Sequence, residues 1–393
     1  MDQPQFSEVV QLRNTLTEYL SHVPDPRKAR GKQLEWLFLL GLIAAALLCQ
    51  HRAPRAIAQW ASYQADALLA AFQPRCGRVP SESTILRTLR HLDIAALEQH
   101  LAQFIHALAD APITPPEPAP SLHGQAVDGK AVRGAQAHGE RTHLVSLVQH
   151  ETAEVLAQTA VPLKRNEISA MPQLLEGRSL QGVVVTMDAL LTQRKLAEQI
   201  LVQQGHYLMV AKDNQRQLTE ELRWFFASEP LPCEVPWGED VRISKGHGRL
   251  ETRHLTCTSE LDGYLTWPGV RQVLRRTCER IMLKTGEVTR SVSYGLTSLG
   301  PEEATPAEIA QLWRGHWTIE NRVHSVRDVT MGEDGCQVHT GHAPQALAAL
   351  RNAVLVLVRK TGWKNVADAL RYYQNHVGKA LELIGASPSP TLT

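Results

Sequence analysis

The chain has 393 residues, with 21% charged residues and a formal net charge of +1, so it is long enough for two or three domains and has no overall charge excess that marks a nucleic-acid partner. Its six cysteines are scattered without close pairs, which argues against a zinc knuckle or a disulfide framework and favours a reducing cytosol. No secretory signal is visible at the start, and the most apolar run, 36–49, is short for a membrane span. We therefore expect a cytoplasmic protein with no membrane partner.

The N-terminal part, residues 1–110, is predicted to be a helical and basic DNA-binding domain. Residues 25–90 hold ten Lys or Arg against four Asp or Glu, a local charge typical of DNA-binding modules. Ser81 can cap a helix on which Arg87 and Arg90 lie away from the apolar face. This pattern fits a helix-turn-helix-like reader, and a solvated basic face on an ordinary bundle fits it about equally well.

Five prolines between residues 111 and 120 predict an extended linker, because proline interrupts both helices and sheet ladders. Beyond it, the pattern predicts, in chain order, strands at 126–128, 143–148 and 155–161, a helix at 166–175, a strand at 183–188, a helix at 192–204 and a strand at 207–211. This order is that of a ribonuclease-H-like core with a mixed five-stranded sheet. In that fold the first and fourth strands are adjacent, so Asp128 and Asp188 would be neighbours.

A capping box at residues 305–308 predicts the start of a helix that runs through Glu320 unless Gly315 interrupts it. Residues at steps of three and four on such a helix share one face. On the face of Glu320 these are Trp313, His316, His324 and Arg327. The long span before this helix implies a β-rich insertion at about 213–300.

Three acids stand in separate, recognisable settings: Asp128 in Ala-Val-Asp-Gly-Lys, Asp188 at the end of Gly-Val-Val-Val-Thr-Met-Asp, and Glu320 in His-Trp-Thr-Ile-Glu-Asn. Together they predict a divalent-metal site built from two strands and a helix. Mg²⁺ takes carboxylate oxygens and leaves positions open for phosphate, so such a site usually acts on phosphodiesters. Taken singly, each acid is better explained by a structural role, Asp128 as a turn residue, Asp188 as a helix cap and Glu320 as a solvated helix acid, but the three together are not.

Basic and aromatic residues around these acids are candidate DNA contacts, with surface salt bridging or a structural role as the alternative. Arg327 is the strongest candidate for binding a terminal phosphate, because its guanidinium group is always charged and can bind a phosphate through two N–H groups. The contribution of His316 should fade as the pH rises past about 6.5. The full set is Arg87, Arg90, Lys130, Arg133, Lys212, Arg249, Arg253, Trp313, His316 and Arg327.

Four motifs in this order, at 126–130, 185–193, 247–253 and 316–321, resemble the H-repeat-associated DDE transposases of bacterial insertion sequences over nearly the whole chain. The resemblance implies a cut-and-paste transposase, nucleoid-associated, that binds terminal inverted repeats and target DNA as a homodimer in the DNA complex. It also implies a catalytic domain at 121–335 followed by a helical region at 336–385.

The same resemblance implies that Asp128, Asp188 and Glu320 are catalytic and bind two Mg²⁺ ions, for which Mn²⁺ can substitute. One ion would activate a water or a 3′-hydroxyl, and the other would stabilise the leaving oxygen.

This chain departs from the family pattern near the last acid. Relatives carry a Tyr, Arg, Glu, Lys signature where it has Trp313, His316, Glu320 and Arg327. They carry Trp or Arg where it has Ser325, Gln337 and His339, so DNA contacts at this edge are expected to be weaker. Two alternatives stay open, a domesticated DNA-binding protein and a hydrolytic nuclease on the same fold that no longer joins strands.

Overall fold

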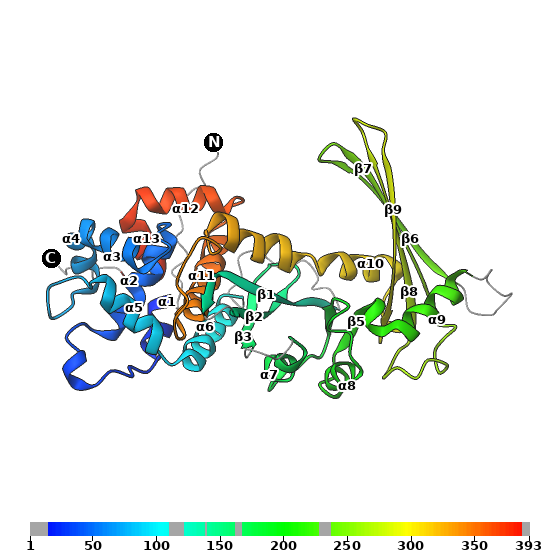
Figure 1. Ribbon diagram of the computed structural model, residues 1–393, viewed down its shortest axis with the longest axis horizontal. Helices are drawn as coiled ribbons and strands as arrows, with labels where there is room; N and C mark the ends of the chain where they lie inside the picture. The colour runs from blue at the N-terminus through cyan, green and yellow to red at the C-terminus, as the bar shows by residue number, and fades with distance from the viewer. Residues whose placement is uncertain (1–14, 110–121, 138–139, 162–166, 228–236, 387–393) are drawn as a thin grey trace.

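The computed structural model describes residues 15–109, 122–137, 140–161, 167–227 and 237–386. Figure 1 shows helices from both ends of the chain gathered on one side, a sheet in the middle, and four long strands projecting at the far side. A mixed α/β fold was predicted and is confirmed. Within the described residues no helix is both long and apolar enough to cross a membrane.

The N-terminal segment is helical, as predicted, and the helix after Ser81 is confirmed as α5 (Glu82–His91). The other helices of this segment are α1 (Leu16–Ser21), η1 (Ala29–Gly31), α2 (Trp36–Leu48), α3 (Pro54–Tyr63), α4 (Ala65–Phe72) and α6 (Ile94–Ala109). They share one hydrophobic core with α11 (Ala343–Lys360), α12 (Val366–Asn375) and α13 (Val377–Ile384). The two ends of the chain therefore stabilise each other.

The described strands form one sheet of nine in the order β3-β2-β1-β4-β5-β9-β8-β7-β6. The first five are β1 (His123–Ala137), β2 (Glu140–Gln149), β3 (Val155–Val161), β4 (Val183–Met187) and β5 (His206–Ala211). β1 pairs antiparallel with β2 and parallel with β4, with Val127 opposite Met187. The predicted adjacency of the first and fourth strands is confirmed.

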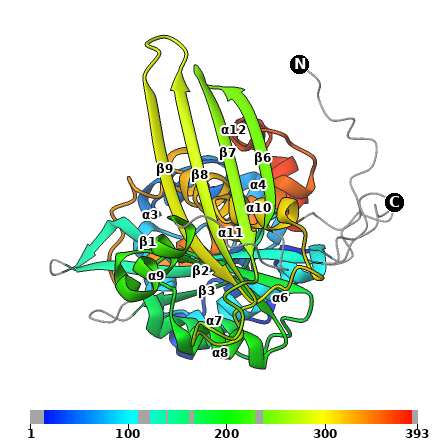
Figure 2. The same ribbon diagram turned by 90° about the vertical axis from the view of Figure 1, so that its right-hand side faces the viewer.

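The predicted five-stranded sheet, interrupted by a β-rich insertion, is wrong in one respect: the strands of the insertion extend the same sheet to nine strands. They are β6 (Gly238–Gly246), β7 (Arg249–Thr258), β8 (Gln272–Met282) and β9 (Val288–Thr297). β9 pairs antiparallel with β5, which would otherwise expose its unpaired backbone groups at a sheet edge. We call β6–β9 the arm; Figure 2 shows its two hairpins standing clear of the rest of the molecule.

Helices cover both faces of the central sheet. Along β4, Val183, Val185 and Met187 pack on one face, whereas Val184 packs on the other, as the two-residue period of a strand requires. The first face is covered by η2 (Glu167–Ala170), α7 (Met171–Leu175), α8 (Arg194–Val202) and α9 (Arg216–Ala227), which follows η3 (Asp213–Gln215). On the second face lies α10 (Pro306–Gly315), visible above the sheet in Figure 1.

The capping box is confirmed at Thr305 and Glu308, and α10 ends at Gly315, as the sequence allowed. After a turn at residues 316–317, the chain forms two π-helical segments, η4 (Ile319–His324) and η5 (Val326–Thr330). Such i→i+5 turns are rare and are often found at functional sites. Because a π turn shifts the angular position of every later residue, the face expected from α-helical spacing is not kept beyond Glu320.

Candidate active site

The three acids come from the three elements that the sequence predicted. Asp128 lies on β1 immediately after the Val127–Met187 pair, and Asp188 follows Met187 directly. Each aspartate has one oxygen fixed by a backbone amide, which Gly129 donates to Asp128 at 2.9 Å and Leu191 donates to Asp188 at 3.1 Å. Glu320 lies on η4 with its side chain exposed.

The negative charges of these acids influence one another's ionisation. Burial, together with the negative charges of Asp188, Glu167 and Glu320, raises the pKa of Asp128 to about 7. One unit of pKa corresponds to about 1.4 kcal/mol, so holding Asp128 ionised here is costly. Local folding energetics do not favour such a gathering of carboxylates, and it therefore points to a cationic ligand.

Glu167 at the start of η2 is a fourth acid that sequence reasoning missed. A Cβ atom on Gly129 would lie only 2.0 Å from the Glu167 carboxyl carbon, so the carboxyl group packs directly on the glycine backbone. Burial raises the pKa of Glu167, and the charge of Asp188 adds to the effect. The glycine after Asp128 was the one sequence signal, since it leaves room for this side chain.

The donor set fits a divalent metal ion chemically, because hard cations prefer carboxylate oxygens. Among the described residues, no three His, Cys, Asp or Glu side chains converge closely enough to hold an ion as they stand. The carboxylates must therefore rotate toward one another before three of them can bind one ion. The exposed Glu320 has the most freedom to do so.

A buried polar chain connects β4 to the helix of Glu320. Thr186 Oγ1 lies 2.9 Å from His150 Nε2 and 3.2 Å from His316 Nδ1. The His150 ring fits between two glycines, since a Cβ on Gly124 or on Gly315 would lie 2.1 or 2.2 Å from its Nδ1. Burial lowers the pKa of His150 to about 3 and also lowers that of His316.

The expected phosphate contact of a protonated His316 is therefore not supported. The desolvation of its ring outweighs the attraction of Asp188, so the ring is neutral at neutral pH. His316 instead positions α10 against β4. His324 is also buried: its Nδ1 lies 3.5 Å from Asp128 Oδ2, and burial lowers its pKa to about 3.

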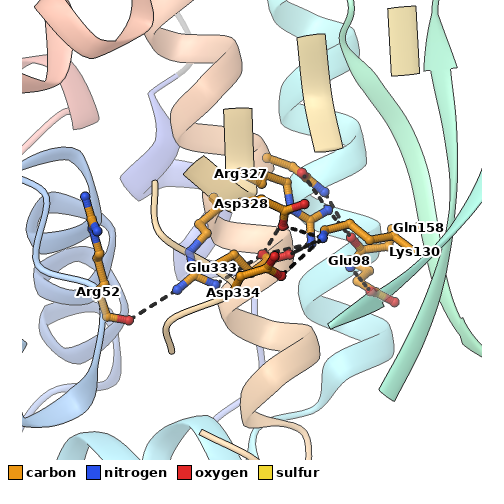
Figure 3. A network of polar contacts seen from close by, with 10 residues as sticks. Arg52, Glu98, Lys130, Gln158, Arg327, Asp328, Glu333 and Asp334 are labelled. Carbon is orange, nitrogen blue, oxygen red and sulfur yellow. Dashed lines mark hydrogen bonds and ion pairs between the residues drawn. The ribbon is translucent and has the colours of Figure 1, made fainter. Parts of the chain in front are cut away.

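Two further expected DNA contacts are buried in the ion-pair network of Figure 3. Lys130 is 7% exposed and pairs with Asp328, and its Nζ also lies 3.8 Å from Glu333. Arg327 is 0% exposed and holds Glu333 through two nitrogens, with a shortest distance of 2.7 Å. Neither can reach DNA in this structure, and both predictions are corrected to structural roles.

Trp313 is also corrected, because it is 3% exposed and packs in the core beneath the Arg276 guanidinium, 4.7 Å from the ring centroid. The other predicted contacts differ in accessibility. Arg87 and Lys212 are exposed; Arg90 is half-buried and donates to Thr340 at 2.5 Å; Arg249 and Arg253 pair with Glu251; and Arg133 lies on β1 with its side chain outside the described part. Their role in DNA binding stays a prediction.

Comparison with known protein families identifies the chain. The family described as "Transposase DDE domain" matches residues 120–357, and the one described as "DDE_Tnp_1-associated" matches residues 17–105. The chain therefore belongs to the DDE transposase family. It is an insertion-sequence transposase, an enzyme that cleaves DNA and transfers strands, with DNA as its partner and a divalent metal requirement implied by the family.

Individual relatives agree with this assignment. The "Putative transposase YncI" of Escherichia coli O157:H7 is 27% identical over 364 residues, covering 88% of this chain and 87% of that one. The "H repeat-associated putative transposase YhhI" of E. coli K12 is 30% identical over 240 residues, 58% of this chain and 62% of that one, which confirms the predicted family. A solved piggyBac transposase synaptic complex with hairpin DNA aligns over 98% of this chain and 81% of that one, with a TM-score of 0.42 and 11% identity, a similarity too low to support an argument.

Proposed function

We propose that Asp128, Asp188 and Glu320 are the catalytic, metal-binding acids of this transposase. The observation that carries the proposal is the mutual electrostatic effect of these carboxylates, with burial and its neighbours' charges raising the pKa of Asp128 to about 7. We further propose two Mg²⁺ ions per site, with Mn²⁺ as a substitute. When bound, such ions activate the attacking oxygen and stabilise the leaving oxygen of a phosphodiester.

The residues of the chain contribute position and charge. One oxygen of Asp128 and one of Asp188 are held by backbone amides, which leaves the second oxygen of each for a ligand. Glu320 would complete the site from η4. Its place on a π-helical turn, between α10 and the buried network around Glu333, fixes its backbone while its exposed side chain can move.

The strand order β3-β2-β1-β4-β5 supports our proposal that the core is ribonuclease-H-like, with the arm inserted at about 213–300. We propose the boundaries 1–110, 111–120, 121–335 and 336–385 for the DNA-binding, linker, catalytic and C-terminal parts.

The substrates would be the terminal inverted repeats and target DNA, bound by a homodimer at the nucleoid in the cytoplasm. The exposed Arg87 of α5 and Lys212 after β5 are the predicted contacts best placed to reach DNA.

The test is cleavage of a labelled duplex that carries the terminal repeat, in Mg²⁺, by Asp128→Asn, Asp188→Asn and Glu320→Gln. Each should lose cleavage while keeping DNA binding and fold, since only a metal-binding charge is removed. Glu198→Gln, an exposed acid on α8, is the matched control and should cleave normally. Cleavage at the wild-type rate by any of the three acid variants would reject that residue. Joining of the cleaved end to target DNA separates a transposase from a nuclease.

A further inference from the structure

A cavity of about 290 Å³ lies between the arm and α10, and four arginines are among the residues that line it. Its walls come from β6, β7 and β8 on one side and from α10 and the residues just after it on the other. The residues that matter here are Arg242, Arg253, Arg276, Arg314 and Trp317.

Two of these arginines have carboxylate partners. Arg242 pairs with Asp240 at 3.0 Å, and Arg253 pairs with Glu251 at 2.6 Å. Within the described residues, Arg276 and Arg314 form no ion pair. Arg276 is largely desolvated, because its guanidinium lies over the rings of Trp313 at 4.7 Å and Trp317 at 5.5 Å. A desolvated guanidinium without a direct ion-pair partner is costly, and an anion in the cavity would offset that cost.

The pairing of the arm strands places Arg242, Arg253 and Arg276 on one face. Asp240 lies opposite Leu255 and Leu255 opposite Arg276, so this cross-strand row points toward α10. The alternate row, from Val241 through His254 to Val292, points away from α10, as does Arg290. The arm therefore presents a cationic face to the helix that leads into Glu320.

Trp317 adds an exposed ring at the same place. Its side chain is 37% exposed and lies three residues before Glu320, in the turn that follows α10. Guanidinium groups bind phosphates bidentately, and exposed tryptophans stack on bases of any sequence. The combination of free arginines with an exposed indole matches a nucleic-acid strand better than it matches a small anion.

We infer that this cavity is a phosphate-binding site for the DNA strand that runs to the three acids, with Arg276 and Arg314 as the phosphate ligands and Trp317 in contact with an adjacent base. This inference rests on the proposed function, because the acids define where the strand ends. Arg276 and Arg314 would also supply the cationic contacts near Glu320 that the buried Lys130 and Arg327 cannot supply.

The test is the salt dependence of DNA affinity, measured by fluorescence anisotropy of a labelled terminal-repeat duplex in EDTA, so that metal binding and cleavage play no part. Each phosphate contact adds about 0.9 to the slope of log affinity against log salt. The double variant Arg276→Gln/Arg314→Gln should lower the slope by about 1.8. Between about 50 and 200 mM salt, its affinity should then fall roughly tenfold less than that of the wild type.

Arg290→Gln is the matched control, since it removes the same charge from the opposite face of the arm and should leave the slope unchanged. Equal slopes in the control and the double variant would overturn the inference. If the double variant is thermally unstable, the single variant Arg314→Gln replaces it in the test. The Arg314 side chain is exposed, so its substitution should leave the fold intact and lower the slope by about 0.9. Trp317→Leu should weaken binding roughly tenfold at an unchanged slope.

The two proposals fail in different ways. If the acids are misassigned, Asp128→Asn still cleaves while the arginine variants still show a reduced slope. If the cavity does not bind DNA, the arginine variants bind with the wild-type slope while the acid variants still lose cleavage.

Discussion

Lys130 and Asp328 form an ion pair that joins the strand of Asp128 to the helix of Glu320. Lys130 is two residues beyond Asp128 on β1 and therefore lies on the same face of the strand. Asp328 lies on η5, which follows the segment η4 that carries Glu320. Glu333 at the centre of the network also binds Arg327 and Arg351, at 2.7 and 3.2 Å, and its pKa is lowered to about 2 despite its burial. Figure 3 shows the network bringing together parts of the chain that are far apart in sequence.

The first prediction concerns this network. Lys130→Met should lower the free energy of unfolding by about 1–3 kcal/mol, because it leaves the partly buried Asp328 carboxylate without its cation, whereas Glu333 keeps its two arginines. Adding Asp328→Asn should restore part of the loss, with a coupling free energy of about 1–3 kcal/mol for residues in direct contact. Urea unfolding of the wild type, both single variants and the double variant provides the measurement. Strictly additive losses would mean that the pair is not energetically coupled.

Local patterns predicted a large part of this fold. The capping box at Thr305 and Glu308 satisfies backbone groups within one helical turn, so the start of α10 could be deduced from four residues. Likewise, the pairing of β1 with β4 followed from the order of the elements, which placed Asp128 beside Asp188.

The errors arise where distant residues decide the outcome. Arg327 was placed beside Glu320 by α-helical spacing, but the π turns change that spacing and turn Arg327 toward Glu333. The partner of Lys130 lies 198 residues away, beyond the reach of local reasoning. Glu167 joins the site through the packing of η2 on β1, which no spacing in the sequence reveals.

The second prediction concerns Gly315, where alanine should destabilise the protein although alanine is the better helix former by about 1 kcal/mol. A Cβ there would lie 2.2 Å from His150 Nδ1, and the ring cannot retreat because Gly124 confines it on the other side. Displacing His150 breaks its contact with Thr186, and we expect a net loss of about 1–3 kcal/mol. Thermal or urea unfolding measures the change.

Gly378→Ala in α13 is the control for this prediction. Apart from the neighbouring residues and the backbone of its own helix, no atom lies within 4 Å of the added Cβ at that position, so only the helix propensity changes. That variant should be stabilised by up to about 1 kcal/mol. If both alanine variants shifted stability in the same direction, the proposed role of the His150 cavity would be wrong.

The last prediction concerns pH. Asp128 has an ordinary pKa of 3.8 and a raised pKa of about 7 in the folded protein, because burial and the nearby carboxylates disfavour its charge. Between these two values the folded state binds more protons than the unfolded state, so the free energy of unfolding should fall as the pH rises through this window. For the metal-free protein the loss due to Asp128 should be on the order of a few kcal/mol, complete above about pH 7. Asp128→Asn does not titrate and should lack this component, so the stability of the variant relative to wild type should increase from about pH 4 to pH 8. Urea unfolding in EDTA across this range measures the difference, which isolates Asp128 from the buried histidines that titrate in both proteins.

Adding Mg²⁺ at pH 8 should then stabilise the wild type much more than Asp128→Asn, because the ion relieves the repulsion that the variant has already lost. Parallel pH curves for the two proteins, or equal stabilisation by Mg²⁺, would show that Asp128 neither senses the neighbouring acids nor binds the ion.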